Sequence, residues 1–345
     1  MKRIVRGLLV CVLGAAVCTA SPVWAEKPVI TVANTGTSIK AAMIVLAHQM
    51  GYYGEEGLDV RIEQISNLNE GATAVQMGKL DVLPLGIIPT AVFVSKGADL
   101  VVFGGTIAEG SQAVTLPENR DMYEDLAAFR GKKVAVVRPE TGHMIMKALI
   151  RKAGVDPERD MEYIILDGFQ SVIESVRKGA VDVGFVNSGF GFIAEKQGLA
   201  VAFNVGKWAP GAVCCRQTTS RAALESKRGA FVKFQVANLR AFELFKNDER
   251  TTIRRLAEFS GQPEDYVRHC LYGGVMIYTL DPVKKRVLDF YEVMKANGDI
   301  DPATPYGMEH AVDTTVYRDA LREVRTRFPE SEVFLKLEKE FAENN

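Results

Sequence analysis

Short apolar runs alternate along this chain with longer stretches in which apolar residues recur at helical spacing. The runs VITVA at residues 29–33, LVVF at residues 100–103 and VAVV at residues 134–137 are apolar at nearly every position. Strands that are apolar on both faces are typical of parallel sheets covered by helices on both sides. The alternation therefore predicts an α/β fold built on parallel sheets.

One phrase of this pattern occurs twice. Residues 78–103 align without a gap with residues 179–204, and each copy predicts a helix-capping glycine, an apolar strand, a turn, a helix, a second capping glycine and another strand. The identical positions are Gly78 with Gly179, Asp81 with Asp182, Val82 with Val183, and Gly97 with Gly198. Since 345 residues exceed one comfortable core, the repeat predicts two similar lobes, each forming one wall of a ligand cleft.

Four turns follow predicted strands and precede predicted helices, at residues 34–40, 86–90, 138–143 and 187–190. In open α/β sheets, ligands bind beyond the carboxyl ends of the strands, where helix N-termini present unpaired N–H groups. We therefore expect hydroxyl, amide and backbone donors of these turns to bind a ligand. The candidates are Thr35, Gly36, Thr37, Ser38, Gly86, Ile87, Thr141, Gly142, His143, Asn187 and Ser188.

Charged and aromatic residues near these turns add further candidates. Lys40, Arg138 and His143 could face an anion, whereas Glu109 and Glu140 would oppose a purely anionic ligand if they point inward. For each of these five residues, a solvated position in the turn is the alternative. Charges of both signs favour a zwitterion such as an aminosulfonate, or a small polar molecule, over bare nitrate. Two aromatic residues are candidates to cover the ligand from the hinge side, with ordinary packing as the equal alternative: Phe190 and Trp208.

The repeated aspartates, Asp81 and Asp182, invite an interpretation as paired catalytic carboxylates. Each lies a few residues after a glycine at a helix-to-strand junction, where Asp commonly satisfies backbone groups of a turn. The position favours a structural role.

The first residues have the pattern of a secretory signal. A basic start, MKRIVR, precedes the apolar stretch GLLVCVLGAAVCTA and a small-residue cleavage site ending at Ala25. The apolar stretch falls short of the ~20 residues that span a membrane. Lipid attachment at Cys18 is the less favoured alternative. Loss of Lys2, Arg3 and Arg6, with no acidic residue, changes the formal net charge from −1 to −4, and we expect a mildly acidic, exported protein.

Three cysteines remain after such cleavage: Cys214, Cys215 and Cys270. Adjacent cysteines rarely bridge each other because their Cα atoms lie only about 3.8 Å apart. One of the pair could bridge Cys270, but the apolar surroundings favour buried, unbridged thiols. The four histidines are scattered singly, and no His or Cys spacing resembles a metal site, so we expect neither a metal nor a cofactor. The net charge and the lack of a dense basic run argue against a nucleic-acid partner.

Several phrases together indicate a family. LAHQMGYYGEEGLDVRIEQI, EGATAVQMGKLDVLPLG, DLAAFRGKKVAVVRPETGH and GAVDVGFVNSGFGFIAEKQGLAV occur in the order found in periplasmic solute-binding proteins of ABC importers, which this chain resembles over residues 28–220. More narrowly, it is similar to the nitrate-, sulfonate- and taurine-binding branch, which shares its fold with thiamine-pyrimidine-binding and synthesis proteins.

The resemblance implies a type II periplasmic binding protein whose chain crosses twice between its lobes. We expect the crossings at GGTIAEGSQA and NVGKWAPGA, where glycines absorb hinge rotation. Lobe 1 is then residues 26–107 plus 208–345, with extra C-terminal helices, and lobe 2 is residues 108–207. Such a protein would act as a monomer, capture a small-molecule solute and deliver it to an ABC transporter permease.

Two other functions compete with this one. Thiamine-pyrimidine synthases share the fold and carry a cysteine-rich metal cluster, which the pair at 214–215 matches poorly, and they are intracellular. No nucleophile stands out beside a base, as covalent catalysis would need. A ligand-binding partner of a membrane sensor is the third possibility. We expect a binding protein rather than an enzyme.

Overall fold

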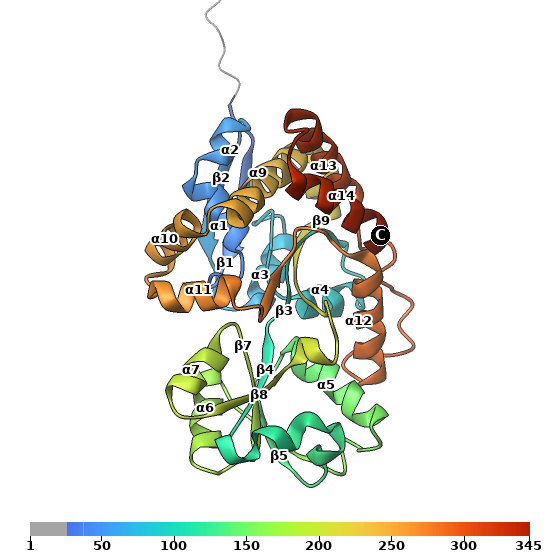
Figure 1. Ribbon diagram of the computed structural model, residues 1–345. Helices are drawn as coiled ribbons and strands as arrows, with labels where there is room; N and C mark the ends of the chain where they lie inside the picture. Colours follow the sequence, from blue (N-terminus) through green and yellow to red (C-terminus); the bar gives the residue numbers. More distant parts are fainter. Residues whose placement is uncertain (1–25, 37) are drawn as a thin grey trace, which may run out of the picture.

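The computed structural model describes residues 26–36 and 38–345. The predicted signal peptide, the lipid-attachment alternative at Cys18 and the candidate ligand residue Thr37 lie outside these ranges. Two lobes are stacked one above the other (Figure 1), and lobe 1, drawn uppermost, carries most of the helices. None of the helices in the described ranges is long and apolar enough to cross a membrane.

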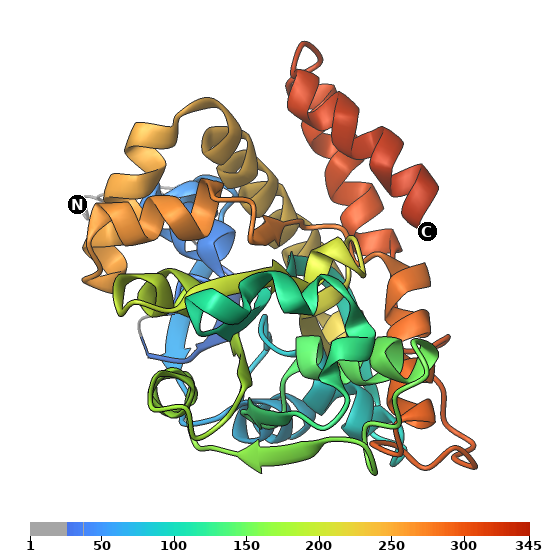
Figure 2. The same ribbon diagram turned by 60° about the horizontal axis from the view of Figure 1, so that its bottom comes forward.

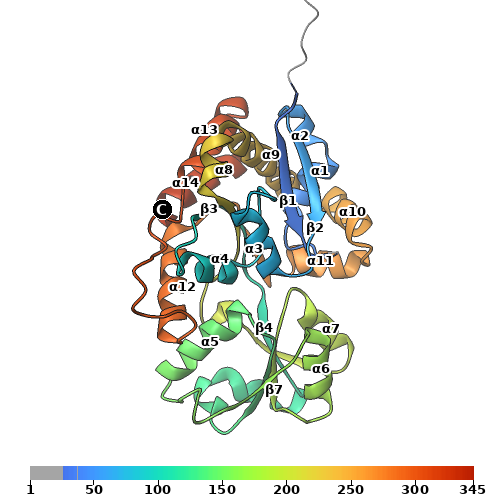
Figure 3. The same ribbon diagram turned by 180° about the vertical axis from the view of Figure 1, so that it is seen from behind.

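Lobe 1 is built on strands from distant parts of the chain. Strand β1 (Val29–Asn34) pairs in parallel with β2 (Asp59–Gln64), and β3 (Leu100–Glu109) pairs antiparallel with both β9 (Val213–Ser220) and β10 (Met276–Tyr278). Residues 82 and 83 connect these groups through single bridges, from Val82 to Val32 and from Leu83 to Thr218. The helices before the first crossing are α1 (Ala42–Gln49), α2 (Tyr52–Glu55), α3 (Leu68–Gln76) and α4 (Ile87–Val94). Seen from behind, α3 and α4 lie at the edge of lobe 1 that faces lobe 2 (Figure 3).

Lobe 2 holds a five-stranded sheet in the order β6-β5-β7-β4-β8. Its strands are β4 (Ser111–Thr115), β5 (Lys133–Val136), β6 (Glu162–Ile165), β7 (Val183–Asn187) and β8 (Ala200–Asn204). Apolar residues alternate between two cores, one under α5 (Thr141–Lys152) and one under α6 (Phe169–Arg177) and α7 (Phe190–Lys196). Short 3₁₀ helices span Pro117–Glu124, Leu126–Phe129 and Val205–Lys207. Both faces of this sheet are covered, as the unbroken apolar runs predict.

The predicted α/β fold is confirmed, but its sheets are mixed rather than purely parallel. Parallel pairing holds between β1 and β2 and between β5 and its neighbours β6 and β7, whereas β4 runs antiparallel to β7 and β8. An unbroken apolar run shows that both faces of a strand are buried and does not report the strand's direction. The antiparallel strands β3, β4, β8 and β9 are those that carry the chain toward and away from the other lobe.

The repeated Gly-x-x-Asp phrase has the same local role in both lobes. Gly78 and Gly179 have φ values of 69° and 67°, in the left-handed region that glycine adopts without strain. Asp81 accepts the Thr31 N–H at 2.9 Å, and Asp182 accepts the Lys133 N–H at 2.8 Å. Each carboxylate thus ties its turn to the neighbouring parallel strand, which is a structural role.

The two crossings lie side by side and are joined by one carboxylate. The first passes directly from β3 to β4 through Glu109 and Gly110, and the second occupies residues 205–212. The Glu109 N–H donates to the Ala212 carbonyl at 2.8 Å, and its carboxylate accepts the Gly211 N–H at 2.6 Å. A Cβ on Gly206 would lie 1.6 Å from the same carboxylate, so a larger residue there would have to displace the Glu109 side chain.

The residues after β9 form helices, as their apolar periodicity predicts. These are α8 (Arg221–Ser226), α9 (Arg228–Asn247), α10 (Glu249–Ser260), α11 (Glu264–Tyr272), α12 (Lys284–Ala296), α13 (Thr315–Arg327) and α14 (Glu332–Asn344). Helix α9 buries its apolar face in lobe 1, where Phe231 meets Phe103 edge-on with ring centroids 4.9 Å apart. Helices α13 and α14 stand away from lobe 2 (Figure 2). Helix α14 continues to Asn344, and the Asn345 amide donates to Asp281 at 2.8 Å.

Candidate functional site

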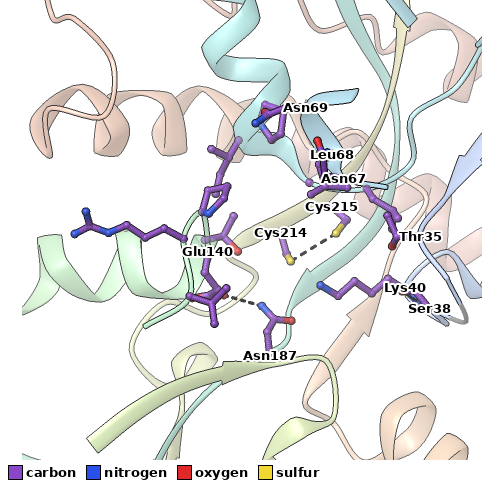
Figure 4. A pocket seen from close by; sticks show the side chains of 18 of the residues that line it. Thr35, Ser38, Lys40, Asn67, Leu68, Asn69, Glu140, Asn187, Cys214 and Cys215 are labelled. Carbon is purple, nitrogen blue, oxygen red and sulfur yellow. Dashed lines mark hydrogen bonds between the residues drawn. The ribbon is translucent and has the colours of Figure 1, made fainter. Parts of the chain in front are cut away.

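A cavity of about 480 Å³ lies between the two lobes (Figure 4). Two further cavities, of about 340 and 330 Å³, share part of its walls and continue the cleft to either side. The lining of the central cavity is Thr35, Ser38, Lys40, Asn67, Leu68, Asn69, Leu85, Gly86, Ile88, Pro89, Val137, Arg138, Pro139, Glu140, Thr141, Phe169, Asn187, Cys214 and Cys215.

The wall from lobe 1 is formed by the turn after β1 and by the starts of α3 and α4. The Lys40 ammonium points into the cavity (Figure 4) and has no ion-pair partner among the residues that the structure describes. Gly86, with φ 66°, opens α4, and a Cβ there would lie 2.5 Å from the Leu68 side chain. The positive φ favours glycine at this position, and a larger residue would also have to displace the Leu68 side chain.

The wall from lobe 2 is organised around the buried carboxylate of Glu140, which is 5% exposed. It caps α5 by accepting the N–H groups of Gly142 at 3.0 Å and His143 at 2.6 Å. The Asn187 amide donates to the same carboxylate at 2.7 Å, and the Ser111 hydroxyl also donates to it. The N-terminus of α5 thus has its own internal anion, so a bound anion does not find these N–H groups free.

His143 lies behind this wall and contributes no positive charge to the cleft. Its side chain is 4% exposed, and its ring meets Tyr163 edge-on with centroids 4.9 Å apart. Burial lowers its pKa to about 3, assisted by the charges of Arg138 and Lys147. The ring is therefore neutral at physiological pH, which overturns the expectation that His143 faces an anion as a cation.

The structure brings eight of the predicted residues into the lining of the central cavity: Thr35, Ser38, Lys40, Gly86, Arg138, Glu140, Thr141 and Asn187. Others lie nearby but outside its lining. Ile87 is buried in the lobe 1 core, Gly36 supplies its carbonyl to the Asn34 amide at 3.0 Å, and Gly142 packs against Ser111. His143 lines one neighbouring cavity, and Ser188 and Phe190 line the other.

Two predicted residues belong to the hinge region and not to the cavity. The Glu109 carboxylate is held by the second crossing, where it accepts the Gly211 N–H. Trp208 packs edge-on against Phe203 of the lobe 2 core, with ring centroids 6.3 Å apart. The sequence placed both near the hinge but did not show which way their side chains point.

Sequence reasoning missed the N-terminus of α3 and its counterpart at the N-terminus of α6. Leu68 and Phe169 both line the cavity and are 101 positions apart, the offset of the repeat, as are Gly86 and Asn187. Extending the repeat backwards would therefore have indicated both. A second signal is the capping box at 67–70, where the Asn67 side chain accepts the Glu70 N–H at 3.0 Å and so marks a helix N-terminus.

Comparison with known proteins now places the chain. The model of the family described as NMT1/THI5 like matches residues 38–250, which is more than half of the sequence. The chain belongs to the NMT1/THI5-like family.

The predicted resemblance of this chain to periplasmic solute-binding proteins is confirmed by solved structures. The aliphatic sulphonate-binding protein SsuA of Escherichia coli is 17% identical with a TM-score of 0.67, covering 83% of this chain and 92% of SsuA. The nitrate-binding protein NrtA of Synechocystis PCC 6803 is 14% identical with a TM-score of 0.70, covering 87% and 90%. These likenesses show the fold.

Curated relatives of this chain include synthases. The 4-amino-5-hydroxymethyl-2-methylpyrimidine phosphate synthase THI13 of Saccharomyces cerevisiae is 26% identical over 141 residues, and the Candida albicans synthase is 23% identical over 141 residues. The match covers 41% of this chain and 40% of each relative. This chain therefore matches about two fifths of the length of these synthases.

In this NMT1/THI5-like chain, two adjacent thiols form part of the cavity lining. Cys214 and Cys215 are buried and unbridged in the structure, as is Cys270, so the expected burial of the three cysteines is confirmed. Within the described ranges, no three or more His, Cys, Asp or Glu side chains gather in a way that could hold a metal ion.

Proposed function

We propose that this protein is an exported solute-binding protein that closes on one small polar solute and delivers it to an ABC importer. The observation that carries the proposal is the cavity itself, which takes one wall from each lobe and is lined by repeat-related residues such as Gly86 and Asn187. Because the chain crosses between the lobes at two neighbouring segments, closure about them brings both walls onto the same ligand. The fold shared with SsuA and NrtA supports this reading.

The charge distribution favours a solute with an anionic group. Lys40 directs an ammonium into the cavity from lobe 1, and no carboxylate among the described residues pairs with it. An anionic ligand group gives this cation its partner in a partly desolvated site, where such a pair is stronger than in water. Glu140 stands on the opposite wall, so we propose a sulfonate or taurine-like solute, with a zwitterion favoured over bare nitrate.

The hydrogen-bonding capacity of the walls suits a small polar molecule. Thr35, Ser38 and Thr141 bring hydroxyl groups, while Leu68 and Phe169 bring apolar surface from equivalent positions in the two lobes. Sites of this kind, apolar surface with a few placed polar groups, are typical of small-molecule binding.

A pyrimidine-precursor-binding protein or a synthase-like enzyme is the second candidate, favoured by the synthases among the curated relatives. We propose binding without turnover, because the buried carboxylate on the lobe 2 wall is committed to capping α5 and to the Asn187 amide. Chemical change of any bound solute by the purified protein would support the enzyme instead.

A thermal-shift screen of sulfonates, taurine, nitrate, amino acids and pyrimidines tests the proposal. A ligand that binds only the folded state raises the melting temperature according to RT ln(1 + [L]/Kd). We expect a sulfonate-type compound to give the largest rise. The largest rise with an uncharged pyrimidine would support the second candidate, and no rise with any compound would contradict solute binding of these classes.

The variant Lys40→Gln should weaken binding of the anionic solute roughly 10- to 100-fold, since a hydrogen bond to a charged group contributes about 1.5–3 kcal/mol. Lys79→Gln is the matched control, because Lys79 is an exposed lysine of the same lobe outside the cavity. Titration calorimetry measures both. Equal affinities of the two variants would remove Lys40 from the site.

A further inference from the structure

Strand β9 contains an irregularity at the point where it passes the cavity. Along β3 the adjacent residues Ile107 and Ala108 pair with Cys215 and Val213, so Cys214 is an extra residue without a partner on β3. In a regular strand, neighbouring side chains point to opposite faces. A bulge re-aims a side chain, and here both cysteines line the same cavity.

The two thiols are close enough to interact. Their sulfur atoms are 3.7 Å apart (Figure 4), and both residues are almost fully buried beneath the cleft. In a regular strand, the side chains of two adjacent cysteines would point to opposite faces of the sheet. The bulge at Cys214 is what allows the two sulfur atoms to lie this close. The strand thus presents a vicinal dithiol on the cavity floor.

The surroundings of the pair favour a reactive thiolate at Cys215. The hydrogen bond with Cys214 holds the pKa of the Cys215 thiol below its usual value, and the Lys40 charge and the Gly86 N–H act in the same direction against the effect of burial. The same hydrogen bond, with burial, raises the pKa of Cys214. A thiolate beside a protonated thiol is the arrangement in which one sulfur attacks and the other follows.

We propose that Cys214 and Cys215 form a redox-active vicinal dithiol in the solute cavity, which a small-molecule disulfide converts reversibly into a ring disulfide. The proposal rests on the strand geometry and goes beyond solute binding. It does not depend on which solute the cleft takes.

The reaction balances as thiol–disulfide exchange. The Cys215 thiolate attacks one sulfur of the disulfide RSSR, the S–S bond of RSSR breaks, and one RS⁻ leaves as a mixed disulfide forms on Cys215. Cys214 then loses its proton and attacks the Cys215 sulfur, which releases the second RS⁻. The two protein thiols are oxidised by two electrons, RSSR is reduced to two RSH, and the two thiol protons end on the products. The short connection between the cysteines strains the ring, so we expect a low-molecular-weight dithiol to reduce it readily.

Oxidised glutathione and intact-mass spectrometry test the proposal on the full mature chain. We expect the wild type and the control Cys270→Ser to lose two hydrogen atoms, and peptide mapping to find the bond between residues 214 and 215. Dithiothreitol should restore the original mass. Cys214→Ser should stop at a mixed disulfide on Cys215, because the resolving thiol is gone. An unchanged wild-type mass, or a bridge from either residue to Cys270, would overturn the proposal.

A second measurement needs no variant and no oxidant. Phenylarsine oxide binds two neighbouring thiols through one arsenic atom, and we expect the reduced wild type to bind one molecule per chain and release it to dimercaptopropanol. If Cys214 and Cys215 can both still be alkylated after this treatment, the pair does not act as a dithiol. That result would equally overturn the proposal.

Discussion

At the scale of single residues, Glu140 defines the character of the cleft more than any predicted ligand residue does. Its carboxylate accepts hydrogen bonds from two backbone N–H groups of α5, from the Asn187 amide and from the Ser111 hydroxyl. All four partners donate a hydrogen bond, so the side chain at this position must be one that accepts hydrogen bonds and donates none, as an ionised carboxylate does. The sequence showed the acid at this position but gave no sign that it would turn inward and cap its own helix.

Replacing Glu140 by Gln tests this arrangement. The Gln amide brings N–H donors into a site that supplies only donors, so we expect a loss of about 1–3 kcal/mol in the free energy of unfolding. Urea denaturation measures the loss. Glu162→Gln is the control, because the Glu162 side chain is exposed, and its change should stay within about 0.5 kcal/mol. Equal stability of the two variants would contradict the buried network.

His143 gives stability a dependence on pH. Because burial lowers its pKa in the folded protein to about 3, the unfolded chain takes up a proton near its ordinary value of 6.5 while the folded chain does not. This contribution to stability is fully present above pH 6.5 and is lost as pH falls from 6.5 toward 3. Denaturation of wild type and His143→Gln across this range should show a difference that shrinks on acidification. The exposed His48 provides the control variant His48→Gln. A constant difference would contradict a buried neutral ring.

At the scale of elements, the hinge depends on one acid and the glycines around it. Glu109 has φ 60°, an uncommon conformation for a residue with a side chain, and its carboxylate fills the space that a side chain on Gly206 would need. The first crossing is therefore held to the second by hydrogen bonds of Glu109, and a side chain on Gly206 would displace its carboxylate.

The variant Gly206→Ala should displace the Glu109 carboxylate and destabilise the protein by about 1–3 kcal/mol, the usual cost of overpacking. Thermal denaturation measures this effect. Gly229→Ala serves as the control, since Gly229 lies in α9 with open space around it, and alanine there should be neutral or stabilising. A Gly206→Ala protein as stable as wild type would show that the hinge tolerates repacking.

The sequence predicted helices and strands well where the repeat and the apolar periodicity indicate which residues are buried. It predicted less well the direction of strands and the orientation of side chains. The repeat predicted paired turns at Gly86 and Asn187, and both line the cavity. The antiparallel course of β4 was missed because an apolar run carries no information on strand direction. The bulge at Cys214 was missed for a related reason, since it depends on the register of β9 against β3.

At the scale of the whole molecule, contacts outside the cavity also join the lobes. The Tyr266 hydroxyl of α11 donates to the Ser188 carbonyl at 2.9 Å, and the Asn297 amide, just after α12, donates to the Met144 carbonyl of α5 at 2.9 Å. The C-terminal helices therefore flank the cleft on both sides. We infer that they limit how far the lobes separate, which keeps the two walls within reach of one small solute.

The central claim, that both lobes hold the same solute, is tested most directly by titration calorimetry of the best ligand from the screen against one variant in each wall. Lys40→Gln alters lobe 1, and Thr141→Val removes a hydroxyl from lobe 2 while keeping the side-chain shape. The account predicts one solute bound per chain, weaker binding in each variant, and full recovery of the solute unchanged. Affinity that depends on one wall alone, or a solute chemically altered by the protein, would contradict it.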